Sequence, residues 1–121
     1  MSICIITCWC CMGKINLLVK YCLINQENEY NIKGILINNK IKFLDNDDKM
    51  ILDKKLNTLK RITKESEILF NFKDKSCLIS DKTNNKISFQ IEVLVLENND
   101  DYFYVKYKII DDLFEIMIKI I

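Results

Sequence analysis

The sequence predicts an all-β protein, an antiparallel up-and-down meander that closes into a small barrel of about 8 to 10 strands. Three observations support this fold class. Apolar and polar residues alternate with a period of two along much of the chain, as in half-buried strands. Strand-sized runs recur about every 8 to 12 residues. Asn and Asp supply the turns, because the chain has no Pro and only two Gly.

The composition indicates one domain. A chain of 121 residues is long enough to bury a core without metals or disulfides, and we expect residues 14–121 to form a single β-barrel domain after an irregular Cys-rich tail over residues 1–13. The chain has 18 basic and 17 acidic residues, and its net charge is +1. Because such a balance creates no strong field, we expect neither a nucleic acid nor a membrane as partner.

The predicted tail carries four of the six cysteines, which are Cys4, Cys8, Cys10 and Cys11. It is too short to span a bilayer, which takes about 20 apolar residues, and it lacks the basic start and cleavage site of a signal peptide. No second cysteine pair follows to complete a zinc site, so we expect no metal, with zinc binding and acylation kept as alternatives. The unpaired thiols favour a cytoplasmic location.

The first half of the chain predicts strands over residues 14–23, 31–37 and 40–44. The last two form a hairpin around Asn38 and Asn39, which sets Gly34 opposite Phe43 so that the ring covers the glycine. Residues 49–62 are ambiguous, because leucines at helical spacing compete with residues such as Asn57 that weaken a helix. Two strands are favoured there. Further strands are expected over residues 68–72 and 77–79.

The final third has the clearest alternation and predicts strands over residues 87–95, 102–109 and 113–121. The first pairing sets Val93 opposite Val105 and Glu92 opposite Lys106. A two-residue turn at 111–112 then sets Tyr107 opposite Ile116 and Lys108 opposite Glu115. A slip by one residue would turn every apolar side chain outward, so burial determines which residues face the core. Ile116 and Ile118 are expected inside.

These patterns resemble a known family. The strand, turn and strand over residues 56–72 and the closing strands over 87–96, 102–109 and 113–121 resemble the YwiB-like family of small bacterial proteins, a domain of unknown function with a lipocalin-like (calycin) barrel. The resemblance covers nearly everything from Lys14 onward, although residues 82–85 stand where members have a Tyr-Gly turn. It implies a barrel whose interior holds a small apolar ligand, and no catalytic residues carry over.

The expected function is that of a non-enzymatic binding or interaction module, with a calycin-type carrier or sensor of a small apolar ligand as the alternative. The candidate ligand-binding residues are the large inward-facing aromatic residues Phe89, Phe103, Tyr107 and Phe114. An unknown protein partner or a second copy could instead meet a sheet edge or the outer positions Leu94, Tyr104 and Met117. We expect no cofactor.

An enzyme is not expected, because the chain has no His and therefore no His-based triad or imidazole metal site. Cys77 would be nucleophilic only if a neighbouring cation lowered its pKa. A cysteine in a strand is more often a small buried apolar residue. The paired aspartates of the turns are expected to be solvated.

Overall fold

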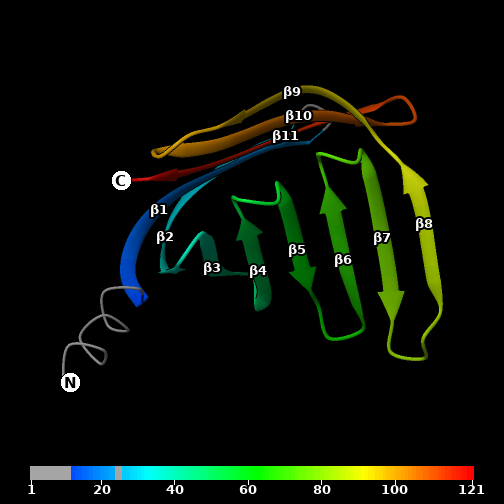
Figure 1. The fold of residues 1–121 in the computed structure, drawn as a ribbon, viewed down its shortest axis with the longest axis horizontal. Helices are drawn as coiled ribbons and strands as arrows, with labels where there is room; N and C mark the ends of the chain where they lie inside the picture. The colour runs from blue at the N-terminus through cyan, green and yellow to red at the C-terminus, as the bar shows by residue number, and fades with distance from the viewer. Residues whose placement is uncertain (1–11, 24–25) are drawn as a thin grey trace.

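The computed structural model describes residues 12–23 and 26–121, which form eleven antiparallel strands in one sheet. Strands that follow each other in the chain pair with each other, apart from β8 and β9, which lie at opposite edges of the sheet (Figure 1). The first strand, β1, also pairs with the last, β11. The strands are β1 (Met12–Leu23), β2 (Gln26–Ile37), β3 (Lys40–Asp45), β4 (Asp48–Asp53), β5 (Thr58–Ile62), β6 (Ser66–Asn71), β7 (Ser76–Asp81), β8 (Lys86–Gln90), β9 (Glu92–Asn98), β10 (Tyr102–Ile109) and β11 (Asp112–Ile120). The predicted all-β meander is confirmed, and the ambiguous segment forms β4 and β5. The four cysteines of the predicted tail lie outside the described residues.

One predicted strand is divided at Ile91. The alternation over residues 87–95 predicted a continuous strand, but β8 ends at Gln90 and β9 begins at Glu92. Between them Ile91 is buried, and its N–H donates to the carbonyl oxygen of Lys75 at 3.0 Å. Here the chain leaves one edge of the sheet and begins the other. Because the period of two continues through this corner, the sequence pattern did not reveal the additional strand.

The sheet curves into a nearly closed barrel with two facing layers (Figure 1). Strands β9, β10, β11 and β1 form one layer, and β3 to β8 form the other. Aromatic rings join the layers, because the ring centroid of Phe72, just after β6, lies 5.9 Å from that of Phe103 and 5.4 Å from that of Tyr107. The edge strands β8 and β9 are not paired with each other, so the barrel keeps one open seam.

The core lies between the layers and is built from the inward-facing residues of the strands. Its most deeply buried side chains, each at most 2% exposed, are Leu17, Val19, Ile41, Met50, Leu52, Leu59, Phe72, Cys77, Phe103, Val105 and Ile118. Ile116 is buried as well, so the prediction that Ile116 and Ile118 face the interior is confirmed. Burying one large apolar side chain is worth about 1.5 to 3 kcal/mol before entropy is subtracted.

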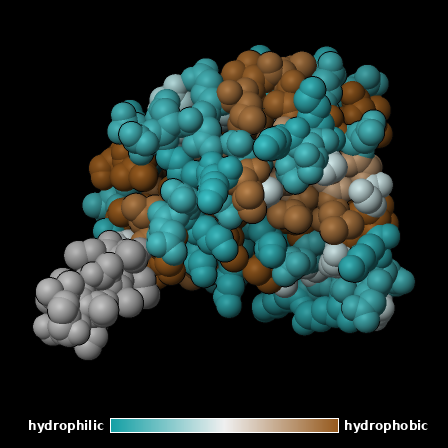
Figure 2. Space-filling model, in the orientation of Figure 1, coloured by the Kyte–Doolittle hydropathy of each residue, from teal (hydrophilic) through white to brown (hydrophobic). Residues whose placement is uncertain are grey.

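The inward-facing apolar side chains are less well buried towards β8. Ile87 on this strand is 64% exposed. Figure 2 shows apolar surface on this side of the molecule, over the ends of β6 to β8 and around β9. Because β8 is an edge strand, it has a neighbouring strand on one side only. The seam therefore leaves part of an apolar face open to solvent.

The pairing of β9 with β10 differs from the predicted register. Val93 lies opposite Tyr107 instead of Val105, and Glu92 lies opposite Lys108 instead of Lys106. Two features cause this difference. Strand β9 continues to Asn98, which shortens the loop before β10. A shift in register between Lys106 and Tyr107 then marks a β-bulge.

The pairing of β10 with β11 is shifted by two residues from the prediction. Tyr107 lies opposite Phe114 instead of Ile116. Glu115 lies opposite Lys106 instead of Lys108, with 3.6 Å between the Lys106 Nζ and Glu115 Oε1 atoms. A shift of two residues keeps every side chain on its predicted face. The faces were therefore predicted correctly although the register was wrong.

The cause of this shift is an unusual turn. Ile109 pairs with Asp112, so the two turn residues are Ile110 and Asp111 instead of Asp111 and Asp112. Ile110 has a φ of 59° and its side chain is 89% exposed. Hairpin turns place Gly, Asn or Asp at positions of positive φ, and a β-branched residue is strained there. Turn chemistry alone therefore could not have located this turn at Ile110.

We expect Ile110→Gly to stabilise the protein by about 1 kcal/mol, because glycine adopts positive φ without a Cβ clash. The melting temperature should rise by about 3 to 5 °C in a thermal unfolding experiment. Ile110→Ala is the control, since it removes the exposed apolar side chain but keeps the Cβ. An equal gain from alanine would show that surface hydrophobicity, and not backbone strain, limits stability at this turn.

Gly34 marks the closest approach of β2 to its neighbours. A Cβ built at this position would lie 2.7 Å from Leu17 Cδ1 and 2.9 Å from the carbonyl oxygen of Lys42. The sequence predicted that Phe43 would cover this glycine, but the β2–β3 pairing ends at Ile35 and Lys42, and the side chain of Leu17 occupies the space. Only a residue without a Cβ allows β1, β2 and β3 to meet here.

Gly34→Ala is therefore expected to lower the free energy of unfolding by about 2 kcal/mol through overpacking. Gly13 on β1 offers a matched control, because a Cβ there would meet no atom within 4 Å. Chemical denaturation should find Gly13→Ala neutral or slightly stabilising. Similar losses for the two variants would contradict the steric explanation.

Candidate ligand-binding cavity

An apolar cavity of about 230 Å³ remains between the two layers of the barrel. Residues of β1, β4, β5, β6, β10 and β11 line it. Most of the wall is apolar and includes Leu59, Ile68, Phe70, Ile109 and Phe114. The strands place these residues inside because each lies at an inward-facing position of the period-two pattern.

Aromatic rings form one side of this cavity. The ring centroid of Tyr107 lies 5.4 Å from that of Phe70 across the layers and 5.3 Å from that of Phe114, on which it stacks. Tyr107 is 4% exposed, and burial raises the pKa of its phenol above the ordinary value. Tyr107 therefore stays neutral and forms part of an apolar wall.

The four aromatic residues predicted to bind a ligand occupy three different environments. Tyr107 and Phe114 line the cavity. Phe103 is fully buried against Phe72 and does not line it. Phe89 packs against the core from β8 and also lies outside the cavity wall. The structure therefore brings two of the four predicted residues to one cavity.

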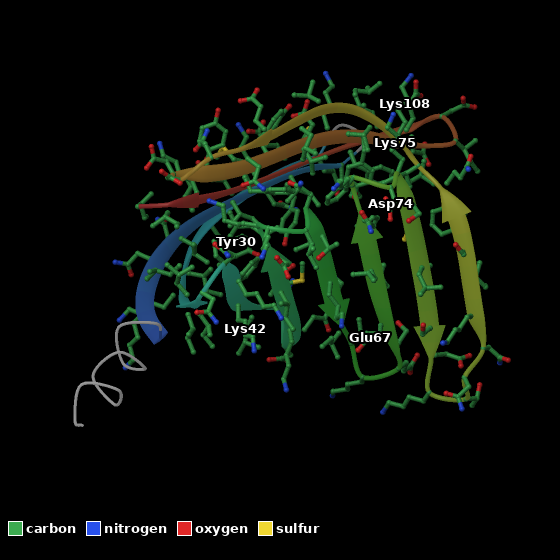
Figure 3. All side chains as sticks on the ribbon, in the orientation of Figure 1. Tyr30, Lys42, Glu67, Asp74, Lys75 and Lys108 are labelled. Atoms are coloured by element: carbon green, nitrogen blue, oxygen red, sulfur yellow. The ribbon has the colours of Figure 1, made fainter. Side chains whose placement is uncertain are left out.

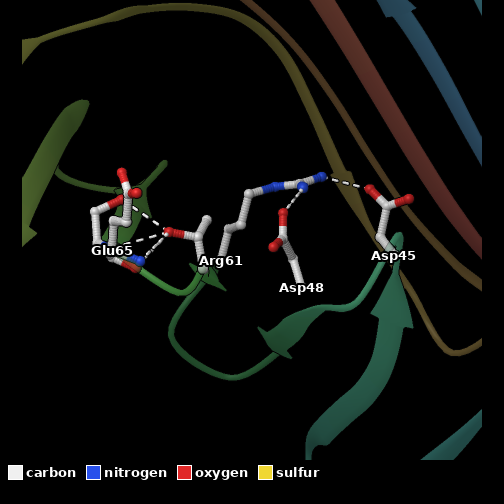
Figure 4. Close-up of polar contacts among 6 residues, drawn as sticks. Asp45, Asp48, Arg61 and Glu65 are labelled. Carbon is white, nitrogen blue, oxygen red and sulfur yellow. Dashed lines mark hydrogen bonds and ion pairs between the residues drawn. The ribbon is translucent and has the colours of Figure 1, made fainter.

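A charged group stands at the polar end of the cavity. Arg61 on β5 lines it, and the guanidinium is held by two carboxylates from the β3–β4 hairpin (Figure 4). Arg61 Nη1 donates to Asp48 Oδ2 at 2.6 Å, and Nη2 donates to Asp45 Oδ2. Burial disfavours the charged guanidinium, but the hydrogen bonds to Asp45 and Asp48 outweigh this cost and raise the pKa of Arg61.

Two tyrosines complete the polar end. The ring centroids of Tyr21 and Tyr30 lie 6.1 Å apart, and neither buried hydroxyl has a hydrogen-bond partner among the described residues. Figure 3 labels Tyr30 on β2. Burial raises the pKa of both phenols, and the nearby carboxylate of Asp45 acts in the same direction. We call Tyr21, Tyr30, Asp45, Asp48 and Arg61 the Arg61 cluster.

The Arg61 cluster lies between the apolar cavity and a second, larger cleft. A cleft of about 700 Å³ lies between β2 and β3, with Tyr30 and Asp45 in its wall. Tyr21, Leu23 and Arg61 line both the cavity and the cleft. The site is thus an apolar cavity joined through the Arg61 cluster to a larger cleft with a mixed polar and apolar lining.

The sequence did not single out this cluster. Arg61 lies two residues after the buried Leu59 and opposite Met50. Asp45 likewise lies two residues after the buried Phe43. Polar residues at inward-facing positions of a period-two pattern were the signal that could have identified the site.

The described residues give no support to a cysteine nucleophile or to a metal site. Burial raises the pKa of the Cys77 thiol to about 11, so this cysteine lacks the lowered pKa that a nucleophile requires. Within residues 12–23 and 26–121, no group of three or more Cys, Asp or Glu side chains is placed to hold a metal ion. Cys22 and Cys77 are both free thiols.

Comparisons with family models, with curated proteins and with solved structures found no match for this chain. The resemblance to the YwiB-like family therefore stays a prediction. The part of the chain that the structure describes contains no helix that is long and apolar enough to cross a membrane.

Asp45→Asn should lower the free energy of unfolding by about 2 kcal/mol, because it removes the more buried carboxylate from a half-buried guanidinium. Asp48→Asn should cost about 1 kcal/mol, since Asp48 is more exposed to solvent. Urea unfolding measures both values.

Arg61→Met in the Asp45→Asn background tests the coupling. The double variant should lose less stability than the sum of its single variants. Arg61→Met removes the guanidinium that Asp45→Asn alone leaves with one carboxylate, and Asp45→Asn removes the more buried of the two carboxylates that Arg61→Met alone leaves unpaired. Additive losses would show that the Arg61 cluster does not act as a unit.

Proposed function

We propose that this protein is a non-enzymatic binding module whose barrel interior holds a small, largely apolar molecule. The observation that supports this proposal is the apolar cavity of about 230 Å³. A dry apolar cavity of about 150 Å³ is large enough to bind benzene. The cavity here therefore has room for a molecule with one or two small rings, and its size lies just below the usual range for small-molecule sites.

The charges at the cavity narrow the class of ligand. Arg61 already has two carboxylate partners, so an anionic head group would have to compete with Asp45 and Asp48. A fixed ion pair of this kind offers little net attraction to a second anion. The expected ligand is uncharged, with a ring or short chain against Ile68, Phe70 and Phe114.

A non-enzymatic role agrees with the chemistry of the side chains. The chain has no His, and the Cys77 thiol is deactivated by burial. A lipocalin-like carrier or sensor in the cytoplasm, related to the YwiB-like family, is the specific form of this proposal. The meander barrel with an internal cavity supports that form, and the free thiols of Cys22 and Cys77 suit a reducing compartment.

Indole is a suitable probe, because it is neutral, largely apolar and close to the expected size. Saturation-transfer NMR and calorimetry should detect indole binding to the native chain. Ile68→Trp fills part of the cavity with a bulky ring. It should therefore weaken indole binding by about tenfold or more, which is a loss of about 1.4 kcal/mol in binding free energy.

Ile87→Trp is the matched control, because Ile87 is exposed on β8 and does not line the cavity. This variant should bind indole like the native protein. Circular dichroism and thermal unfolding show whether each variant is folded. No binding by the native protein, or equal binding by both folded variants, would refute the proposal that the cavity is the site.

A further inference from the structure

The two sides of β2 are paired very differently. Strand β2 pairs with β1 along all twelve residues, from Gln26 opposite Leu23 to Ile37 opposite Met12. With β3 it pairs only at Ile35, Leu36 and Ile37. Among the described residues, none pairs with the β3-facing side of β2 between Gln26 and Gly34. The sheet therefore contains a second free edge, within the barrel wall instead of at the seam.

This free edge borders the cleft of about 700 Å³. Asn28, Tyr30 and Ile32 of β2 line one side, and residues 44–46 at the end of β3 line the other. The cleft narrows towards Gly34, where the carbonyl oxygen of Lys42 approaches most closely. Its shape is that of a wedge between two strands that meet at one end only.

Along β2, the backbone N–H and C=O groups of successive residues point alternately to β1 and to the free edge. Ile37 and Lys40 flank a two-residue turn, so they form the hydrogen-bonded pair that closes the hairpin. Alternate residues along an antiparallel strand direct their N–H and C=O groups to the same side. Glu27, Glu29 and Asn31 consequently direct theirs into the cleft, whereas Asn28 and Tyr30 direct theirs to β1.

The open end of the cleft is acidic. Glu29 of β2 and Asp45 of β3 line it. Glu27 lies on the same face of β2 as Glu29, and Asp47 and Asp48 follow Asp45 in the β3–β4 hairpin. Among the cations, Lys20 lies opposite Glu29 on β1, Lys49 follows Asp48, and Arg61 is on β5, whereas Lys33 and Lys42 lie towards the narrow end near Gly34. Lys20 pairs with Glu27 at 2.6 Å, and Arg61 is held by Asp45 and Asp48. Glu29 has no ion-pair partner among the described residues.

We propose that the free edge of β2 binds an extended segment of a partner protein in which basic and apolar residues alternate. Unpaired backbone groups of an edge strand are a template for an added strand. The apolar side chains of the segment face Tyr30 and Ile32 on the floor of the cleft. Its basic side chains lie on the outer face, beside Glu27 and Glu29. The cleft shares Tyr21, Leu23 and Arg61 with the apolar cavity, but Glu29, Tyr30 and Ile32 do not line the cavity.

Amide hydrogen exchange measured by NMR tests the proposal directly. The probe is a short blocked peptide of alternating lysine and valine, and the comparison peptide has glutamate in place of lysine. In the free protein we expect β1 to protect the amides of Asn28 and Tyr30 and those of Glu29 and Asn31 to exchange rapidly. The lysine peptide should protect Glu29 and Asn31, and the glutamate peptide should not.

Glu29→Gln tests the charge without changing the shape of the side chain. It should weaken binding of the lysine peptide about threefold, in line with an exposed charge pair, and added salt should reduce the difference. Glu67→Gln is the matched control, because Glu67 is an exposed glutamate on β6. Ile68→Trp should leave peptide binding unchanged, which separates this proposal from ligand binding in the cavity.

Three outcomes would overturn the proposal. Protection of Glu29 and Asn31 in the free protein would show that the edge is already covered. Protection that grows with protein concentration alone would identify a second copy as the occupant. Equal binding of both peptides, or peptide-induced changes confined to β8 and β9, would show that neither the acidic rim nor the free edge of β2 is used.

Discussion

The packing of two curved strand layers on each other is the constraint on which the rest of this structure depends. Phe72 touches both Phe103 and Tyr107 across the layers, at centroid distances of 5.9 and 5.4 Å. Every strand must present its apolar side to this contact, because a strand turned over would bury its charges. The cavity, the Arg61 cluster and the free edge of β2 are all places where this packing is incomplete. The candidate sites are therefore the places where the core stops.

The sequence was sufficient to predict the fold class and most inward faces, because burial acts on each strand separately. The exception is the end of β9, where Leu96 and not Val95 lies opposite the buried Val105. Phe103, Ile116 and Ile118 are buried as their alternation predicted. The strand registers could not be predicted in the same way. The turn at Ile110 contradicts the residue preferences of turns, and the bulge on β9 does not change the apolar pattern of the sequence. The break at Ile91 was also hidden, because the period of two is the same on both sides of it.

The candidate site was predictable only in part, for a related reason. Tyr107 and Phe114 were found because they are large, apolar and on inward positions, yet Phe89 and Phe103 satisfy the same rule and lie away from the cavity. Which inward residues border a void depends on how the two layers meet, and no local pattern encodes that. The inward position of Arg61 was visible in principle, but its partners Asp45 and Asp48 come from another hairpin and required the pairing of β4 with β5.

The unpaired seam between β8 and β9 has a consequence for how large a guest the interior can accept. In a closed barrel the number of strands and their stagger fix the diameter, so widening one breaks hydrogen bonds. Here the ring is already interrupted between two edges that share no ladder. Moving β8 and β9 apart about Ile91 would widen the barrel without breaking a strand pair, at the cost of the hydrogen bonds that join Asn98 to Lys54 and Asn57.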